Sequence, residues 1–217
     1  MPTRLKVCCI ASREEAALAI RHGASAVGLV SAMPSGPGPI DEALIAEIAA
    51  SVPPPVATFL LTCATDAEAV VAQVRRCRTS TIQLVDAVEP AVYDSLRLAL
   101  PGVKLVQVIH VQDEGSLAEA QAAATRVDAL LLDSGNPKLA VKELGGTGRA
   151  HDWRLSRRIV ETAGIPVFLA GGLNPGNVRE AVAAVRPFGI DVCSGLRSDG
   201  RLDERKLAPF AAAVLGF

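Results

Sequence analysis

The sequence predicts an α/β protein of the (β/α)₈ barrel class, in which eight parallel strands alternate with eight helices. Apolar segments of strand length alternate with amphipathic segments of helix length throughout the 217 residues, and no unit carries a large insertion. The core must be aliphatic, since 50% of the residues are hydrophobic but only 3% are aromatic. Helices packed on parallel strands use such residues. An open, doubly wound sheet is the alternative, because strand order cannot be read from a sequence.

Each predicted strand is a short apolar run, and each predicted helix repeats apolar residues with helical spacing. The expected strands are 5–10, 26–31, 56–61, 81–85, 104–111, 128–133, 165–170 and 189–194. The expected helices are 13–22, 41–50, 66–76, 89–100, 115–124, 152–162, 174–184 and 203–214. Side chains that can cap a helix N-terminus stand at five starts: Ser12, Asp41, Asp66, Asn174 and Asp203. Gly23 and Gly164 are typical of helix ends. We expect residues 1–217 to form one domain.

The charge balance excludes several classes of function. The chain has 22 basic and 23 acidic residues, for a net charge of -1, which argues against a nucleic-acid footprint or a basic membrane-binding face. No apolar run has the length of a membrane span, and a strand pattern begins directly after the N-terminus, so we expect a cytoplasmic protein without a signal peptide. Five cysteines without metal-site spacing indicate reduced thiols and no metal.

Two reactive side chains come at the ends of predicted strands. Cys8 lies in the first strand, and Asp133 follows three consecutive leucines in the sixth. Because the C-terminal ends of barrel strands meet at the ligand site, the thiol and the carboxyl can act as general base and general acid. A carboxylate at the end of a leucine run would otherwise be costly to bury.

Glycine turns follow the last two predicted strands. Gly171 and Gly172 precede the helix expected from Asn174, and Ser194 and Gly195 end the eighth strand. Glycine lets backbone N–H groups approach an anion at a helix N-terminus, and phosphate sites recur after strands 7 and 8 of such barrels. We therefore expect phosphate binding here, with a merely tight turn as the alternative. The long loops 33–39 and 134–150 lie at the same end and are expected to be functional.

Together these motifs resemble the phosphoribosylanthranilate isomerase family of tryptophan biosynthesis, nearly from end to end. The matching stretches are Lys6-Val7-Cys8, Gln83-Leu84, 128–134, Gly145-Gly146-Thr147-Gly148 with Asp152-Trp153, 170–175 with Asn177-Val178, and Asp191-Val192 with Ser194-Gly195. The resemblance implies a (β/α)₈ fold and an Amadori rearrangement without metal or cofactor. It makes Asp133 the general acid that protonates the ribose ring oxygen, and Cys8 the general base that removes the proton from ribose carbon two.

The resemblance also implies a phosphorylated small molecule as the partner, held at Gln83, Gly146, Gly171, Gly172, Asn174, Asp191, Ser194 and Gly195.

The two proposed proton-transfer groups need opposite pKa shifts. A buried carboxyl has a raised pKa, as a general acid needs. A cysteine base needs a lowered pKa, and Lys6, on the same strand face as Cys8, can support the thiolate. The alternative for Cys8 is an inert buried thiol. We expect a monomer or a homodimer.

The chain departs from the family pattern at four positions. Cys9 replaces a glycine, and we expect it to face away from the barrel interior and fill the core. Val85 stands where a histidine is usual. Gly38 stands where a loop arginine lies near the anthranilate carboxylate, and Arg197 replaces a glutamate. The positions that recognise the aromatic acid have therefore changed.

Three cations can replace the missing arginine: His110 at the end of the fifth strand, Arg149 after the Gly145–Gly148 loop, and Arg197. Each also has a structural interpretation, as a core or capping histidine or as surface arginines.

Three functions stay open at this point: the isomerase itself, a paralogous barrel enzyme for another phosphorylated sugar or aminosugar, and a non-catalytic sugar-phosphate binding protein. Retention of both Cys8 and Asp133 argues against the last.

Overall fold

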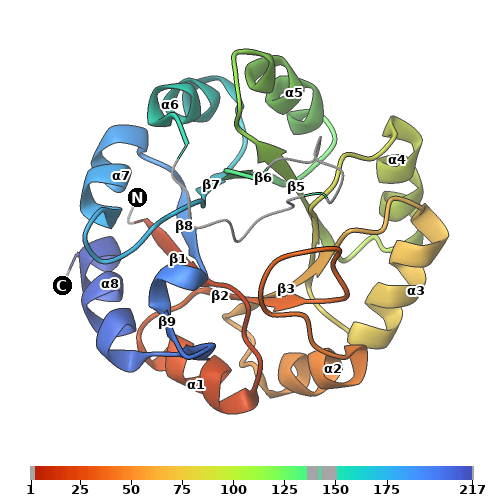
Figure 1. Cartoon of the computed structure of the whole chain (residues 1–217). Coiled ribbons are helices and arrows are strands. Elements are labelled where there is room, and N and C mark those ends of the chain that lie inside the picture. The colour runs from red at the N-terminus through yellow and green to blue at the C-terminus, as the bar shows by residue number, and fades with distance from the viewer. Residues whose placement is uncertain (1–2, 136–141, 143–150, 217) are drawn as a thin grey trace.

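The parallel strands close into a barrel in sequence order, and the helices surround it (Figure 1). The computed structural model describes residues 3–135, 142 and 151–216. Within them the strands are β1 Arg4–Val7, β2 Ala26–Val30, β3 Ala57–Thr62, β4 Thr81–Leu84, β5 Lys104–His110, β6 Ala129–Asp133, β7 Val167–Leu169 and β8 Gly189–Val192. The helices are α1 Arg13–Arg21, α2 Glu42–Ser51, α3 Ala67–Cys77, α4 Pro90–Ala99, α5 Gly115–Ala124, α6 Trp153–Thr162, α7 Val178–Val185 and α8 Glu204–Leu215. The predicted fold class is confirmed.

Pairing of the first and last strands closes the barrel, with Lys6 opposite Asp191 and Val7 opposite Val192. Apolar side chains form two clusters. One joins strands to helices, whereas the other consists of residues on strands and strand ends, including Phe59, Leu131 and Phe168, and so fills the barrel interior. This alternation along each strand is what places odd-numbered residues of β6, Asp133 among them, inside.

Most predicted boundaries differ from the structure by one or two residues, and the larger differences lie at β1, at α7 and after β8. β1 ends at Val7 because Cys9 adopts a φ of 60°, which no strand accommodates. α7 begins at Val178 with Asn177 as its N-cap, so the expected start at Asn174 is wrong. A short helical turn η1, Ser194–Leu196, and a hairpin of β9 Arg197–Ser198 and β10 Arg201–Leu202 follow β8, and the prediction had neither.

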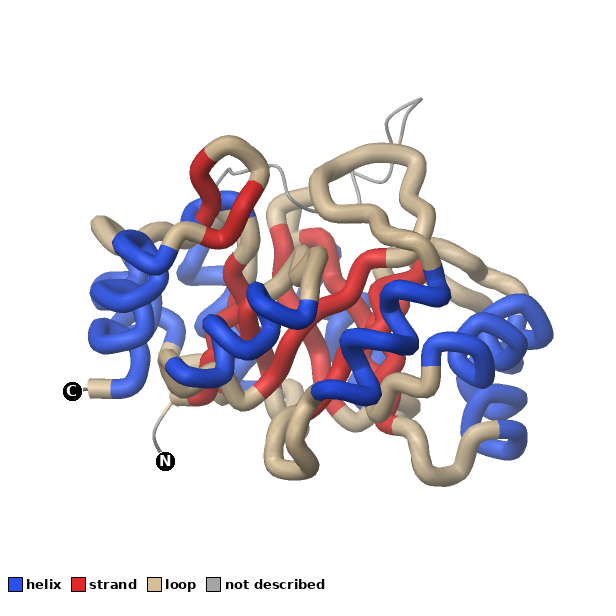
Figure 2. The backbone as a smooth tube through the Cα atoms, turned by 90° about the horizontal axis from the view of Figure 1, so that it is seen from below, coloured by secondary structure: helices blue, strands red, loops and turns tan. Residues whose placement is uncertain are grey.

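The loops that follow the strands gather at one end of the barrel, together with the β9–β10 hairpin (Figure 2). Both chain ends lie toward the other end. Among the helices that the structure describes, none is long and apolar enough to cross a membrane.

Candidate active site

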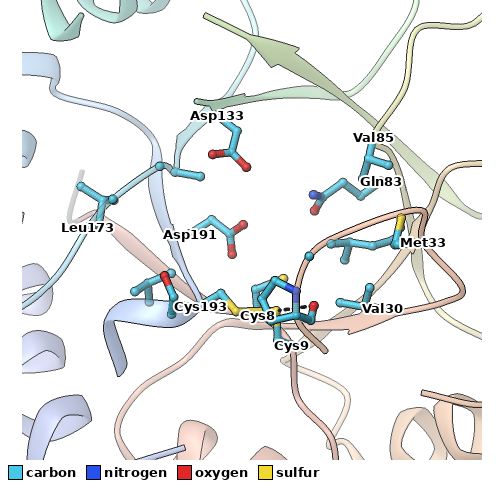
Figure 3. Close-up of a pocket in the computed structure, with 18 of the residues that line it drawn as sticks. Cys8, Cys9, Val30, Met33, Gln83, Val85, Asp133, Leu173, Asp191 and Cys193 are labelled. Carbon is cyan, nitrogen blue, oxygen red and sulfur yellow. Dashed lines mark hydrogen bonds between the residues drawn. A yellow bond between two sulfur atoms is a disulfide. The ribbon is translucent and has the colours of Figure 1, made fainter. Parts of the chain in front are cut away.

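A pocket opens at the C-terminal end of the strands (Figure 3). Its described walls come from the ends of β1, β2, β3, β4, β6, β7 and β8 and from the segments that follow them. They consist of Cys8, Cys9, Val30, Met33, Ser35, Gly36, Pro37, Leu61, Gln83, Val85, Asp133, Ala170, Gly171, Gly172, Leu173, Asp191, Val192, Cys193 and Ser194. Cys8 and Asp133, from β1 and β6, approach the cavity from different sides. The two candidate proton-transfer groups therefore share one pocket.

Asp133 is a buried carboxyl with one firm local partner. Its Oδ1 accepts a hydrogen bond of 2.7 Å from the backbone N–H of Ser134. Burial raises the pKa of Asp133 above its ordinary value, against the opposing effect of that hydrogen bond. A carboxyl in this state holds a proton at pH values where a solvated one has lost it, and this is what a general acid requires.

Cys8 follows β1 and is buried against β8, where its backbone N–H donates to the carbonyl of Val192 at 2.8 Å. Burial raises the pKa of this thiol to about 11, and the neighbouring ammonium of Lys6 opposes the rise. This shift is opposite to the lowered pKa that a cysteine base needs. Lys6 is nevertheless the cation placed to favour the thiolate.

Lys6 and Asp191 form an ion pair inside the barrel, beside Cys8. The Nζ–Oδ1 distance is 2.8 Å, and the Lys6 side chain is 0% exposed. Its ammonium also lies 5.1 Å from the ring centroid of Phe59, a cation–π distance. Burial lowers the pKa of Lys6, but Asp191 and Cys8 outweigh that effect and raise it overall. The sequence offered one signal for this pair, a lysine within an apolar strand that requires a buried partner.

The glycine turn after β7 has backbone conformations that favour glycine. Gly171 and Gly172 have φ values of 82° and 64°, which glycine adopts without strain. Asn177 stabilises the turn, since its Nδ2 donates to the Gly172 carbonyl at 2.9 Å and its Oδ1 accepts from the Asn174 N–H at 2.9 Å. Asn174 instead caps its own turn through Gly176, so it does not begin the helix.

The turn after β8 packs tightly on the turn after β7. A Cβ at Gly195 would lie 2.0 Å from the carbonyl oxygen of Leu173, so only glycine permits this approach. Ser194 and Gly172 both line the pocket, and the two turns thus form one continuous wall.

Gln83 faces the cavity from β4 (Figure 3). It is 3% exposed, and its Oε1 is buried with no hydrogen-bond partner among the residues that the structure describes. Beside it, Val85 occupies the position where the family has a histidine. Since a buried amide oxygen without a partner is costly, Gln83 is suited to contact a bound molecule.

The structure does not bring the proposed replacement cations to the described pocket wall. His110 is buried, and its Nε2 lies 2.9 Å from the carbonyl oxygen of Val85. Arg197 pairs with Glu15 at 3.0 Å, and its guanidinium also bonds the backbone carbonyls of Cys8 and Cys9. Both side chains are therefore engaged in structural contacts. Arg149 lies outside the described residues, as does Gly146.

Gly38 leaves no space for the family's arginine. It has a φ of 90°, and a Cβ there would lie 2.6 Å from the Cβ of Cys9. Pocket contacts in this loop come from Ser35, Gly36 and Pro37 instead. An arginine introduced at position 38 would therefore be strained and could not restore the family contact.

The prediction that all five cysteines are reduced thiols is wrong for two of them. Cys9 forms a disulfide with Cys193, and both line the pocket, so Cys9 does not face away from the barrel interior. Its positive φ turns the side chain out of strand alternation. Cys8, Cys63 and Cys77 are free. The described residues contain no cluster of His, Cys, Asp or Glu that could hold a metal.

The closed barrel with its C-terminal pocket defines an enzyme of the (β/α)₈ class. A family model described as N-(5'phosphoribosyl)anthranilate (PRA) isomerase matches residues 5–213. The chain belongs to this family.

Individual relatives agree with the family model. The chain is 35% identical to N-(5'-phosphoribosyl)anthranilate isomerase of Methanocella arvoryzae over 205 residues, or 94% of each chain. It is 37% identical to N-(5'-phosphoribosyl)anthranilate isomerase 2 of Methanosarcina mazei, over 95% of this chain and 92% of that one. A crystal structure of phosphoribosyl anthranilate isomerase in complex with reduced 1-(o-carboxyphenylamino)-1-deoxyribulose 5-phosphate is 25% identical. It covers 99% of this chain and 100% of its own, with a TM-score of 0.80.

Proposed function

We propose that this protein is an N-(5'-phosphoribosyl)anthranilate isomerase of tryptophan biosynthesis. The observation that carries the proposal is the match to the family over residues 5–213, combined with one pocket that contains both Cys8 and Asp133. The solved relative that holds a product-like deoxyribulose 5-phosphate supports a phosphorylated small molecule as the ligand. A cytoplasmic location and a monomeric or homodimeric state stay predictions from the sequence.

In the proposed reaction, the substrate phosphate binds at the joined turns of Gly171–Gly172 and Ser194–Gly195. Protonated Asp133 gives its proton to the ribose ring oxygen; the ring C–O bond breaks, and a cationic C=N bond forms between carbon one and the aryl nitrogen. Cys8 then removes the proton from carbon two, and the released electron pair forms an enol-amine. The Cys8 thiol then returns a proton to carbon one while the enol hydroxyl gives its proton to the Asp133 carboxylate, which yields the aminoketose. Both side chains return to their starting states, so atoms and charge balance without a cofactor.

The thiolate required for the second step forms against the raised pKa of Cys8. Lys6 favours it, because an ammonium beside a thiolate in a low-dielectric interior stabilises the charge. We propose that Lys6 is a positioning residue and that Asp191 holds Lys6 in place through their ion pair. Cys8→Ser is expected to lower turnover about a hundredfold with a smaller change in KM, as for a group that acts in proton transfer.

The direct test is turnover of phosphoribosylanthranilate, followed by the loss of its anthranilate fluorescence, together with complementation of a tryptophan auxotroph that lacks this isomerase. Cys63→Ser, a half-exposed thiol outside the pocket wall, is the control. Growth and turnover by the wild type and the control, with both lost in Cys8→Ser, support the proposal.

One observation favours the paralogous enzyme as the second candidate: the described pocket wall contains no arginine and no lysine to pair with an aryl carboxylate. Absence of turnover and of complementation by the wild type would make that candidate the better one.

A further inference from the structure

The pocket wall contains a sulfur pair that the reaction does not use. Cys9 follows β1, and Cys193 follows β8. Their Cα atoms are 5.9 Å apart although 184 positions separate them in the chain. Their neighbours in sequence are Cys8 and Ser194, so the bond joins the strand end that carries the candidate base to the turn proposed for phosphate (Figure 3).

We propose that Cys9 and Cys193 are a reversible dithiol–disulfide modification site, and that the disulfide form binds the substrate phosphate more tightly. The inference rests on the proposed function for its kinetic consequence. The oxidant is a small disulfide of the glutathione class. The Cys193 thiolate, at the more exposed of the two sulfurs, attacks it and expels one glutathione thiolate. The Cys9 thiolate then attacks Cys193 Sγ and expels the bound glutathione, so two protein thiols are oxidised and one disulfide is reduced.

The backbone at Cys9 supports a role for the sulfur itself. Cys9 has a φ of 60°, in the left-handed region that favours glycine, and glycine is the residue that the family pattern has at this position. A side chain at this position is disfavoured by the backbone. The gain from a cysteine must therefore come from its sulfur, whose partner Cys193 lies in the same wall.

Reduction of the disulfide must move the turn after β8, which contains Cys193 and Ser194, rather than Cys8 and Asp133. Two unbonded sulfurs have to separate to van der Waals contact. Cys9 has no space to retreat, because its Cβ packs on the backbone at Gly38 and its Sγ lies 3.6 Å from the Pro37 carbonyl. Arg197 also holds the Cys9 carbonyl. Movement therefore falls on the half-exposed Cys193 and on Ser194 directly after it.

The test equilibrates the full-length protein in glutathione buffers of stated ratio and then traps free thiols with N-ethylmaleimide for peptide mass spectrometry. In oxidised buffer, Cys63 is expected to be labelled, whereas Cys9 and Cys193 are recovered as one linked pair. In reduced buffer all three are labelled. KM for phosphoribosylanthranilate is expected to be roughly fivefold or more lower in the oxidised protein, as for coupling between a modification and a ligand site, with kcat changed less than KM.

Matched variants separate this site from a general redox effect. Cys9→Gly and Cys193→Ser are each expected to lose the redox dependence of KM, and Cys63→Ser is expected to retain it. Titration with inorganic phosphate, followed by isothermal calorimetry, gives a readout that does not depend on turnover. A protein without isomerase activity that still binds phosphate more tightly when oxidised would overturn the proposed function and leave this site standing. Full labelling of Cys9 and Cys193 in oxidised buffer, or equal phosphate affinity in both states, would overturn this site.

Discussion

Burial in the barrel mouth determines the protonation of individual side chains. The pKa of Asp133 is raised, chiefly by burial, so between the ordinary and the raised pKa the folded protein holds a proton that the unfolded chain has released. Stability is therefore lost as the pH rises through this window. The same burial that suits Asp133 to its proposed role as general acid makes its ionised carboxylate a cost to the fold.

Asp133→Asn is expected to lower turnover about a hundredfold while it keeps or raises the melting temperature at neutral pH, because an amide does not ionise. Turnover assays and thermal melts between pH 4 and 8 measure both effects. Asp199→Asn, at an exposed turn with a φ of 50° that asparagine tolerates, is the control. A melting temperature that falls only in Asp133→Asn at neutral pH would contradict this account.

Burial of His151 changes the pH dependence of stability in the sense opposite to that of Asp133. Its Nε2 lies 2.7 Å from Ser156 Oγ, and burial lowers the pKa of His151 from 6.5 to about 4. The unfolded chain binds a proton more readily in this range, so stability is lost as the pH falls from 6.5 toward 4. His151→Gln keeps a polar group beside Ser156 and is expected to flatten this decline in the melting temperature. His22→Gln, at a surface pair with Glu204, should leave the decline unchanged.

At the scale of elements, the sequence predicted helices better than strand ends. Caps such as Ser12 and Asp66 accept the hydrogen bonds expected of them, since capping is local chemistry. Asn174 has the same chemistry but lies three residues before the N-cap position of α7, which Asn177 occupies without a capping hydrogen bond from its side chain. Asn177 holds the turn after β7 through its hydrogen bonds to Gly172 and Asn174, and η1, after β8, packs against it. Packing between distant segments of this kind cannot be read from local sequence.

Gly195→Ala tests whether the two turns act as one wall. The added Cβ would meet a backbone carbonyl at 2.0 Å, so η1 must shift away from the turn after β7. We expect affinity for inorganic phosphate to fall about tenfold or more, as for the loss of one or two charge-assisted hydrogen bonds. Calorimetric titration measures the affinity. Gly102→Ala, at an exposed loop position where a Cβ meets nothing within 4 Å and the φ is not in the left-handed region, is the control. Equal affinity in the wild type and Gly195→Ala would contradict the joined wall.

Across the whole molecule, periodicity predicted the alternation of strands and helices, and only the pairing of β1 with β8 decides between the barrel and an open sheet. The prediction that Cys8, Asp133, Gly172 and Ser194 share one pocket is confirmed. The Cys9–Cys193 disulfide could not be predicted, because the cysteines come together only when β8 closes on β1. Burial of Arg197 against Glu15 was hidden for the same reason. Contacts between the two ends of the chain exist only in the closed barrel.

Arg197 links these ends, since it contacts α1 through Glu15 and the end of β1 through the carbonyl of Cys9. Both side chains of the ion pair are largely buried. Arg197→Ala is expected to lower the free energy of unfolding by roughly 3–5 kcal/mol, because Glu15 would keep a buried charge without its partner. Chemical denaturation measures this change. Arg13→Ala, which removes the exposed pair with Glu47, should change it little. Equal effects in the two variants would show that the Arg197 pair is not structural.

The pairing of Lys6 with Asp191 has a consequence for synthesis on the ribosome. Lysine at position 6 emerges among the first residues, and its only described carboxylate partner follows 185 positions later. A nascent chain that stops before β8 must either leave this ammonium in water or bury it alone, and lone burial is costly. The early strands therefore cannot settle into their final interior until the last strand has been translated. Locking of the barrel interior is therefore a late step of folding that depends on β8.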